Sequence, residues 1–216
     1  MESPKTSNTF IGLLVAGNQS WFTGLDFSGV GASAGQNTNG RTDPEFGYKF
    51  GITVNHELSA RFSMECSPGY VFEQSNHRND FTDFHLSLSW VELPVTINYS
   101  FTLKKNLSVF VGSGFAVRKL TKSVMKITTT LSNGFSVNGS YDENINEWNV
   151  FPTIQLGGNI RLSDISRLTV LFAYQRSLSK LFRPSNLPPS INATSVDLDF
   201  TQNSFTCSMA YSVNVR

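Results

Sequence analysis

Apolar and polar residues alternate along most of this chain with a period of two, the spacing that places one residue class on each face of a β-strand. The clearest stretch is residues 46–54, where Phe46, Tyr48, Phe50, Ile52 and Val54 alternate with Gly47, Lys49, Gly51 and Thr53. No apolar run approaches the roughly 20 residues that a membrane helix needs. The sequence therefore excludes a transmembrane helix. It does not exclude a membrane-spanning β-barrel, because the strands of such a barrel carry apolar residues only at alternate positions.

The same alternation predicts eight strands. They cover residues 10–18, 46–54, 58–66, 84–101, 107–117, 154–162, 168–174 and 205–215. Near Val91 and Glu92 the apolar positions change parity. This change predicts a β-bulge, because one extra residue reverses the side toward which the following side chains point.

Long and short connections alternate between these strands. The long ones are residues 19–45, 74–83, 131–147 and 181–204, and the short ones are 55–57, 102–106 and 163–166. Tight turns on one rim and long polar loops on the other are typical of outer-membrane barrels. We therefore predict an all-β, eight-stranded antiparallel up-and-down transmembrane β-barrel with short periplasmic turns, long extracellular loops and both termini periplasmic.

The barrel should occupy residues 9–216. Residues 1–8 contain no export signal, which an outer-membrane precursor must carry, so we expect them to be a leader remnant or a tag.

Composition supports a membrane protein. Charged residues make up 15% of the chain and aromatic residues 12%, whereas charged residues make up about 25% of an ordinary soluble domain. The net charge of +1 and the lack of a basic stripe argue against nucleic-acid binding. A soluble lipocalin-like carrier remains an alternative, because a soluble barrel also alternates.

Charged residues on the polar strand faces predict the content of the lumen. Eight strands leave just enough room for side chains to fill the interior, and buried charges must be paired. We expect no water channel but an ion-pair network in the lumen, made of Arg61, Glu65, Glu92, Arg118 and Arg161.

One pair of residues could carry chemistry. His85 and Ser87 are two positions apart on one strand face, where a histidine and a serine with a nearby carboxylate, Glu92 or Asp83, could form a hydrolase site. Their parity, however, places them on the polar, lumen side. We therefore expect a hydrogen-bonded polar pair at the mouth of the lumen and no enzymatic activity, and keep a lipid A-modifying barrel hydrolase as an alternative.

Metal and disulfide chemistry are not expected. His56 and His77 have no partner residues at ligand spacing, so no metal and no cofactor is predicted. Cys66 and Cys207 should face lipid on strands that are not neighbours, which argues against a disulfide.

The third long connection contains a hairpin signal. Asn133-Gly134 lies between residues with high strand propensity. We expect a ribbon beyond the membrane whose edge could bind a protein partner by β-augmentation, through Thr128, Thr130, Asn133, Gly134 and Phe135.

Three segments carry a family resemblance. The run Trp90-Val91-Glu92-Leu93-Pro94-Val95 resembles the Y-x-E-[IL]-P-[LV] strand of the PorT-like outer-membrane β-barrel family of Bacteroidetes, with Trp90 where the family usually has Tyr. Residues 12–18 and 112–114 also resemble that family. The resemblance implies an outer-membrane location and about eight strands, and it brings no catalytic site. Some members take part in protein secretion or surface display.

The sequence therefore predicts a non-enzymatic outer-membrane barrel with a plugged polar lumen, which acts through its extracellular loops as a structural, adhesion or secretion-associated component. The expected partners are outer-membrane lipid and lipopolysaccharide, with a protein partner possible at the loops.

Overall fold

The computed structural model describes residues 8–23, 41–78, 82–130, 136–141, 146–179 and 201–215, and all regular structure in them is β. Among these residues, no helix is long and apolar enough to cross a membrane. The strands are β1 (Thr9–Thr23), β2 (Arg41–Glu57), β3 (Phe62–Cys66), β4 (Gly69–Arg78), β5 (Thr82–Lys104), β6 (Leu107–Thr130), β7 (Ser136–Tyr141), β8 (Trp148–Arg161), β9 (Ser166–Arg176) and β10 (Thr201–Val215).

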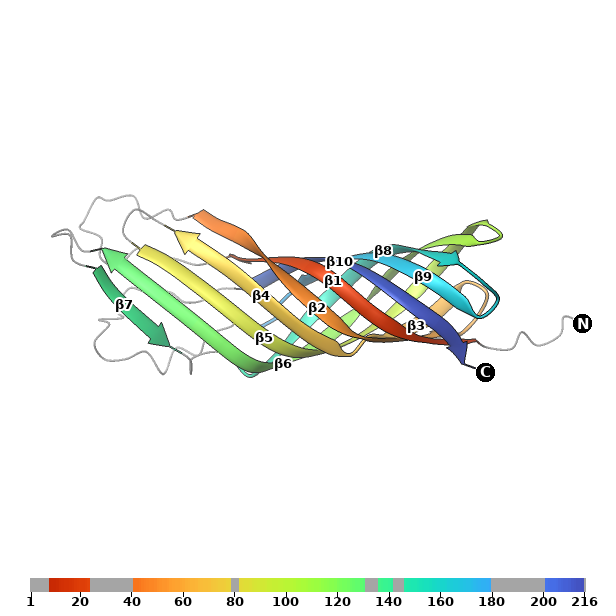
Figure 1. Cartoon of the computed structure of the whole chain (residues 1–216), viewed down its shortest axis with the longest axis horizontal. Helices are drawn as coiled ribbons and strands as arrows, with labels where there is room; N and C mark the ends of the chain where they lie inside the picture. Colours follow the sequence, from red (N-terminus) through yellow and green to blue (C-terminus); the bar gives the residue numbers. More distant parts are fainter. Residues whose placement is uncertain are drawn as a thin grey trace, which may run out of the picture.

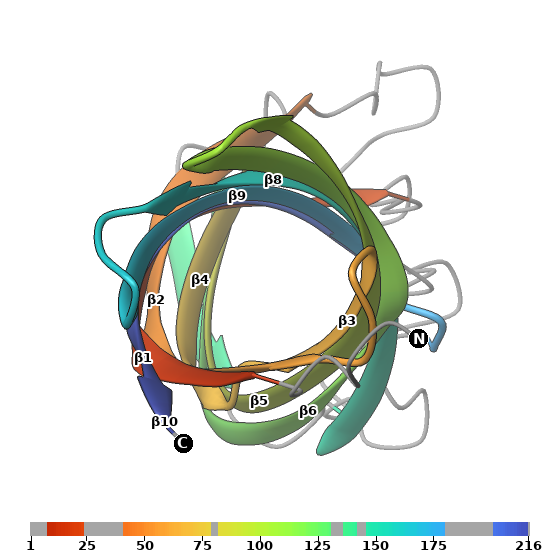
Figure 2. The same cartoon turned by 90° about the vertical axis from the view of Figure 1, so that its right-hand side faces the viewer.

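The sheet closes on itself, because β1 pairs antiparallel with both β2 and β10 (Figure 2). β3 and β4 both pair with β2 and β5, so together they occupy one strand position of the wall. β7 and β8 both pair with β6 and together occupy another. The ten strands of the described residues thus make an antiparallel ring with eight strand positions, which confirms the predicted fold class.

The short connections lie at one end of the barrel, together with the start of β1 and the end of β10 (Figure 1). Backbone hydrogen bonds hold them there, from Glu57 N to Asn8 O at 2.9 Å and from Asn214 N to Ile165 O at 2.7 Å. We call this end, with residues 58–61, 105–106 and 162–165, the turn rim. The opposite end, where β1 ends and β10 begins, is the loop rim.

The bounds of the predicted connections differ from the structure, most clearly at two of them. The first turn occupies residues 58–61 rather than 55–57, because β2 continues to Glu57. The predicted long loop 74–83 is largely strand, since β4 continues to Arg78 and β5 begins at Thr82. Strand-forming alternation thus persists at the loop rim beyond the segments that we assigned to the barrel wall.

Part of the sheet projects past the barrel at the loop rim (Figure 1). β6 pairs with β8 only as far as Lys119, and farther out it pairs with β7, from Met125↔Tyr141 to Thr130↔Ser136. A ribbon is therefore present where the sequence predicted one. Thr128 and Thr130 lie on β6, while Asn133, Gly134 and Phe135 lie outside the described residues.

The two faces of the wall differ in polarity. Large apolar side chains point outward and are exposed, as at Phe46, which is 79% exposed. The buried side chains of the interior are mostly polar or charged. A lipocalin-like carrier has the reverse arrangement, an apolar interior inside a wet surface. The free thiols Cys66 and Cys207 lie on β3 and β10, which do not pair.

The predicted bulge lies on a different strand. Along β5, Leu86, Leu88, Trp90 and Glu92 are all buried at 1% exposure or less, so this strand keeps its facing. The register shifts opposite, on β6, where Ser89 pairs with Lys122 and Trp90 with Leu120. The extra residue is Thr121. As a consequence, the apolar run of β5 points into the lumen, and His85 and Ser87 point outward.

Candidate functional site

Four charged side chains from four strands meet in the lumen. Arg118 on β6 donates from Nε to Glu92 Oε2 at 2.6 Å and from Nη1 to Glu73 Oε2 at 2.8 Å. Lys49 Nζ lies 2.5 Å from the other oxygen of Glu92. The side chains of Glu73, Glu92 and Arg118 are exposed by 1% or less, and that of Lys49 by 11%. We call these four residues the charged plug.

Amide and aromatic side chains complete the plug. Arg118 Nη2 donates to Gln175 Oε1 at 2.7 Å, and Gln202 Nε2 donates to Glu73. The guanidinium of Arg118 lies 4.1 Å from the centroid of the Phe151 ring. Buried ions are tolerated only when paired and hydrogen-bonded, and this plug contains two acids and two bases with donors and acceptors around them.

The sheet register explains how the plug assembles. Glu92 and Arg118 are direct cross-strand partners on β5 and β6, so both side chains project into the lumen at the same height. Lys49 projects from β2 between the inward positions of Gly47 and Gly51, which carry no side chain and leave it room. Glu73 enters from β4.

The other predicted members of the network lie elsewhere. Glu65 is buried, but it accepts hydrogen bonds from Ser67 Oγ at 3.0 Å and Asn98 Nδ2 at 3.3 Å, nearer the turn rim. Arg61 is exposed in the 58–61 turn and donates to Tyr99 Oη at 3.0 Å. Arg161 is exposed at the end of β8. The prediction that Arg61 and Arg161 join the lumen network is wrong, because both reach the open mouth, where water solvates them.

Several plug residues were missed from the sequence. Lys49 was assigned to the polar face but not to the network, and Glu73 to no strand. A signal for Glu73 exists, since Tyr70 and Phe72 alternate with Val71 and Glu73 as a strand would. Gln175 and Gln202 carry no charge, and no local pattern separates them from other polar positions.

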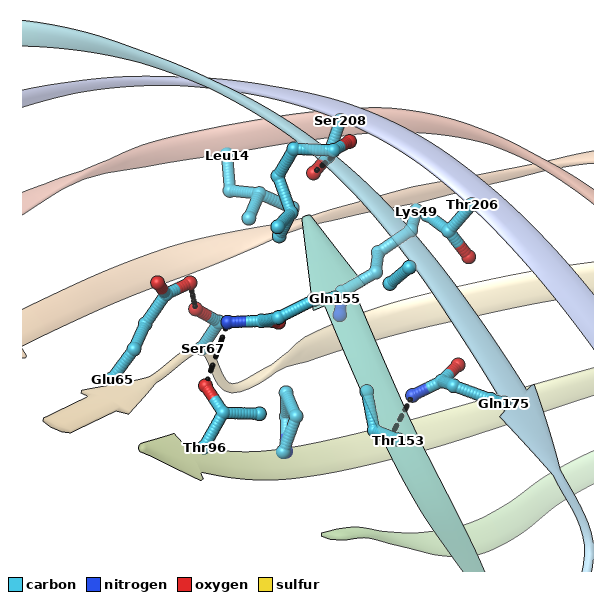
Figure 3. A pocket seen from close by; sticks show the side chains of 13 residues that line it. Leu14, Lys49, Glu65, Ser67, Thr96, Thr153, Gln155, Gln175, Thr206 and Ser208 are labelled. Atoms are coloured by element: carbon cyan, nitrogen blue, oxygen red, sulfur yellow. Dashed lines mark hydrogen bonds between the residues drawn. The ribbon is translucent and has the colours of Figure 1, made fainter. Parts of the chain in front are cut away.

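The packed plug leaves little space in the lumen. Beside it lies a cavity of about 30 Å³, lined by Lys49 and Gln175 among others, and crossed by hydrogen bonds from Ser67 to Glu65 and from Gln155 to Thr96 (Figure 3). That volume holds a water or two. A wider cavity of about 450 Å³ lies at the turn rim, lined partly by Arg61, Arg161 and Arg167. In the described residues, the lumen is therefore packed around the plug and opens into a wide cavity at the turn rim.

A second polar cluster lies on the outer surface of the wall. Ser87 Oγ lies 3.1 Å from His85 Nε2, and His85 Nδ1 lies 3.6 Å from Glu45 Oε2. Gln74 Nε2 donates to Ser87 Oγ at 3.5 Å. We call Glu45, Gln74, His85 and Ser87 the wall cluster. Its carboxylate comes from β2, and was not considered from the sequence, whereas Glu92 lies in the plug.

Metal-binding groups do not gather in the part of the chain that the structure describes. No group of three or more His, Cys, Asp or Glu side chains is placed there to hold a metal ion. The Nδ1 atom of His56 lies 2.9 Å from Thr9 Oγ1, which fits a hydrogen bond between neighbouring strands.

Comparisons with known proteins agree with this architecture. The family described as "Outer membrane protein beta-barrel domain" matches residues 9–183, and the chain belongs to this family of bacterial outer-membrane proteins. No curated protein matches it.

Among solved structures, the chain is similar to outer membrane protein OprG from Pseudomonas aeruginosa, with a TM-score of 0.50, 12% identity, and coverage of 97% of this chain and 96% of that one. Neisserial surface protein A gives 0.45 and 9%, covering 93% and 95%. The Ail protein of Yersinia pestis gives 0.38 and 11%, covering 94% and 97%. At such identities the likeness concerns the fold alone.

Proposed function

We propose that this protein is a closed outer-membrane barrel that acts at the cell surface, as a structural or adhesion component or as part of a secretion complex. The observation that carries the proposal is the charged plug. Because Arg118, Glu73 and Glu92 are bonded to one another across the lumen, the interior formed by the described strands is closed to solutes at this height. What remains for function is the surface.

In this proposal the turn rim faces the periplasm and the loop rim faces outward. Outer-membrane barrels place their short turns in the periplasm and their long connections outside. Here the turns of residues 58–61, 105–106 and 162–165 share one rim with the start of β1 and the end of β10. Both termini are then periplasmic.

The loop rim has features suited to contacts outside the membrane. The sheet extends past the barrel there, with β7 paired to the outer part of β6. On β6, Lys126 is exposed where β7 pairs with it, and Lys119 and Lys122 are exposed just below that part. Lys119 Nζ lies 5.5 Å from the centroid of the Trp148 ring. An aromatic ring with nearby cations suits the membrane interface, where lysines attract anionic headgroups such as those of lipopolysaccharide.

Within its family, we place the chain near the PorT-like barrels. Support for this is the Glu92-Leu93-Pro94 run of β5, whose glutamate is a plug residue. In this structure the run has a physical role, since Glu92 pairs with Arg118 inside while Leu93 points outward.

Site-specific crosslinking in native membranes tests the proposal. A photoreactive residue replaces Lys126 at the loop rim or, as a matched control, Lys105 at the turn rim; both lysines are exposed. We expect protein or lipopolysaccharide adducts at position 126 and not at 105. Adducts confined to position 105, or none at either position, would contradict a role at the cell surface.

A further inference from the structure

The wall cluster has the arrangement of a hydrolase site. The sequence placed His85 and Ser87 on the lumen side, away from lipid, but the structure places them outside. Both lie at outward positions of β5, since the residues that alternate with them, Leu86 and Leu88, are buried inside. We propose that Ser87 and His85 are the nucleophile and general base of a serine ester hydrolase, with Glu45 positioning the histidine.

The distances support these roles. Ser87 Oγ lies 3.1 Å from His85 Nε2, within hydrogen-bond reach of a base. Glu45 Oε2 lies 3.6 Å from His85 Nδ1, on the opposite side of the ring. This carboxylate favours the tautomer that carries its proton on Nδ1, which leaves Nε2 free to accept the serine proton. Serine, histidine and carboxylate come from only two strands, β5 and β2.

A donor for the developing oxyanion is also present. Gln74 on β4 is the cross-strand partner of Ser87, and its Nε2 lies 3.5 Å from Ser87 Oγ. When an ester carbonyl is attacked by Ser87, its oxygen acquires negative charge close to that atom. A side-chain amide at this position can donate to the charge, as oxyanion-hole donors do.

The position of the cluster indicates the substrate. Glu45 precedes Phe46, an outward aromatic residue that is 79% exposed, and the aromatic belts of barrels mark the membrane interface. With the orientation proposed above, on which this step rests, the cluster lies at the outer leaflet. Lys126 is the exposed cross-strand partner of His85, and Lys122, also exposed, precedes it on the same strand. Acyl ester bonds next to an anionic headgroup fit this setting.

The reaction needs only water as co-reactant. His85 Nε2 accepts the Ser87 hydroxyl proton as Oγ bonds to the ester carbonyl carbon, and the carbon–oxygen bond to the alcohol then breaks. The alcohol leaves with the proton from His85. Water then gives a proton to His85 and attacks the acyl carbon, and Ser87 Oγ leaves and recovers that proton. The products are a fatty acid and the deacylated amphiphile.

Fatty-acid release from vesicles tests the proposal with the full chain. The folded protein is placed in vesicles that contain lipopolysaccharide or, in a second arm, phosphatidylglycerol. We expect fatty-acid release from one or both kinds of vesicle, and we expect this release to fall to background in Ser87→Ala and His85→Ala. Glu45→Gln should lower kcat at least about 10-fold with little change in KM, because it acts through His85. The two arms distinguish a glycolipid substrate from a phospholipid.

The control is Ser89→Ala, two residues farther along β5 and outside the cluster, which should keep full activity. Heat-modifiable gel migration verifies that every variant is folded. The proposal is overturned if folded wild-type protein and Ser87→Ala release equal amounts of fatty acid in both arms. If a fluorophosphonate labels Ser87 but no fatty acid is released, the assignment of Ser87 as nucleophile stands and the proposed lipid substrate is wrong.

Discussion

Glu92 and Arg118 face each other across neighbouring strands inside the barrel, with Arg118 Nε 2.6 Å from Glu92 Oε2 and both residues 1% exposed. This pair is the centre of the plug, because Arg118 also forms an ion pair with Glu73, and Glu92 also forms one with Lys49. A single substitution at either residue therefore leaves another buried charge without its partner.

Replacement of Arg118 by Met should strongly destabilise the barrel. The carboxylates of Glu73 and Glu92 would stay buried and lose their shared cation, a change that typically costs about 3–5 kcal/mol. The free energy of unfolding, measured by urea titration in detergent, checks this. The control Arg161→Gln, at the exposed end of β8, should change it by no more than about 0.5 kcal/mol. Equal effects of the two substitutions would contradict a buried plug.

An arginine at position 15 tests the lipid-facing surface. Val15 lies near the middle of β1, points outward and is 62% exposed. Arg there should weaken folding into lipid vesicles by about 2–4 kcal/mol, as expected near the midplane, while Leu103→Arg at the turn rim should cost about 0–1 kcal/mol. If Val15→Arg folds as stably as Leu103→Arg, the outward face does not contact hydrocarbon.

Gly157 should be required by the packing of the lumen. A Cβ at this position would lie 2.5 Å from Phe110 Cζ and 2.6 Å from Val170 O, so Gly157→Ala must displace a buried ring or the backbone. We expect a loss of about 1–3 kcal/mol in urea titration. Gly17→Ala, which meets nothing within 4 Å, should lose no stability and can gain up to about 1 kcal/mol. Stability losses of similar size at both glycines would argue against the tight contact with Phe110.

The overall barrel could be predicted from the sequence because two signals repeat along the whole chain. Period-two alternation located the strands of the wall, and alternating connection lengths indicated their order. Errors in strand ends had local effects. Arg61 was assigned to the lumen because the first turn was placed at residues 55–57, and in the structure it lies in the turn itself.

The facing of individual side chains was harder to predict. Strand β5 carries an apolar run through Leu86, Leu88 and Trp90, which a membrane barrel would normally point outward. In the structure this run points inward. The bulge lies at Thr121 on the paired strand β6, so the β5 sequence contains no sign of it. This reversal moved His85 and Ser87 to the outer surface, where Glu45 from a distant segment meets them.

Electrical recording across a planar lipid bilayer tests the closed lumen most directly. Full-length protein, shown to be folded by heat-modifiable migration, is inserted at known density, and an open porin in the same membrane serves as the positive control. The charged plug of Lys49, Glu73, Glu92 and Arg118 predicts no stable conductance steps above the bare membrane. Regular, long-lived steps that scale with the amount of inserted protein would show that the lumen conducts ions, and would contradict a role confined to the cell surface.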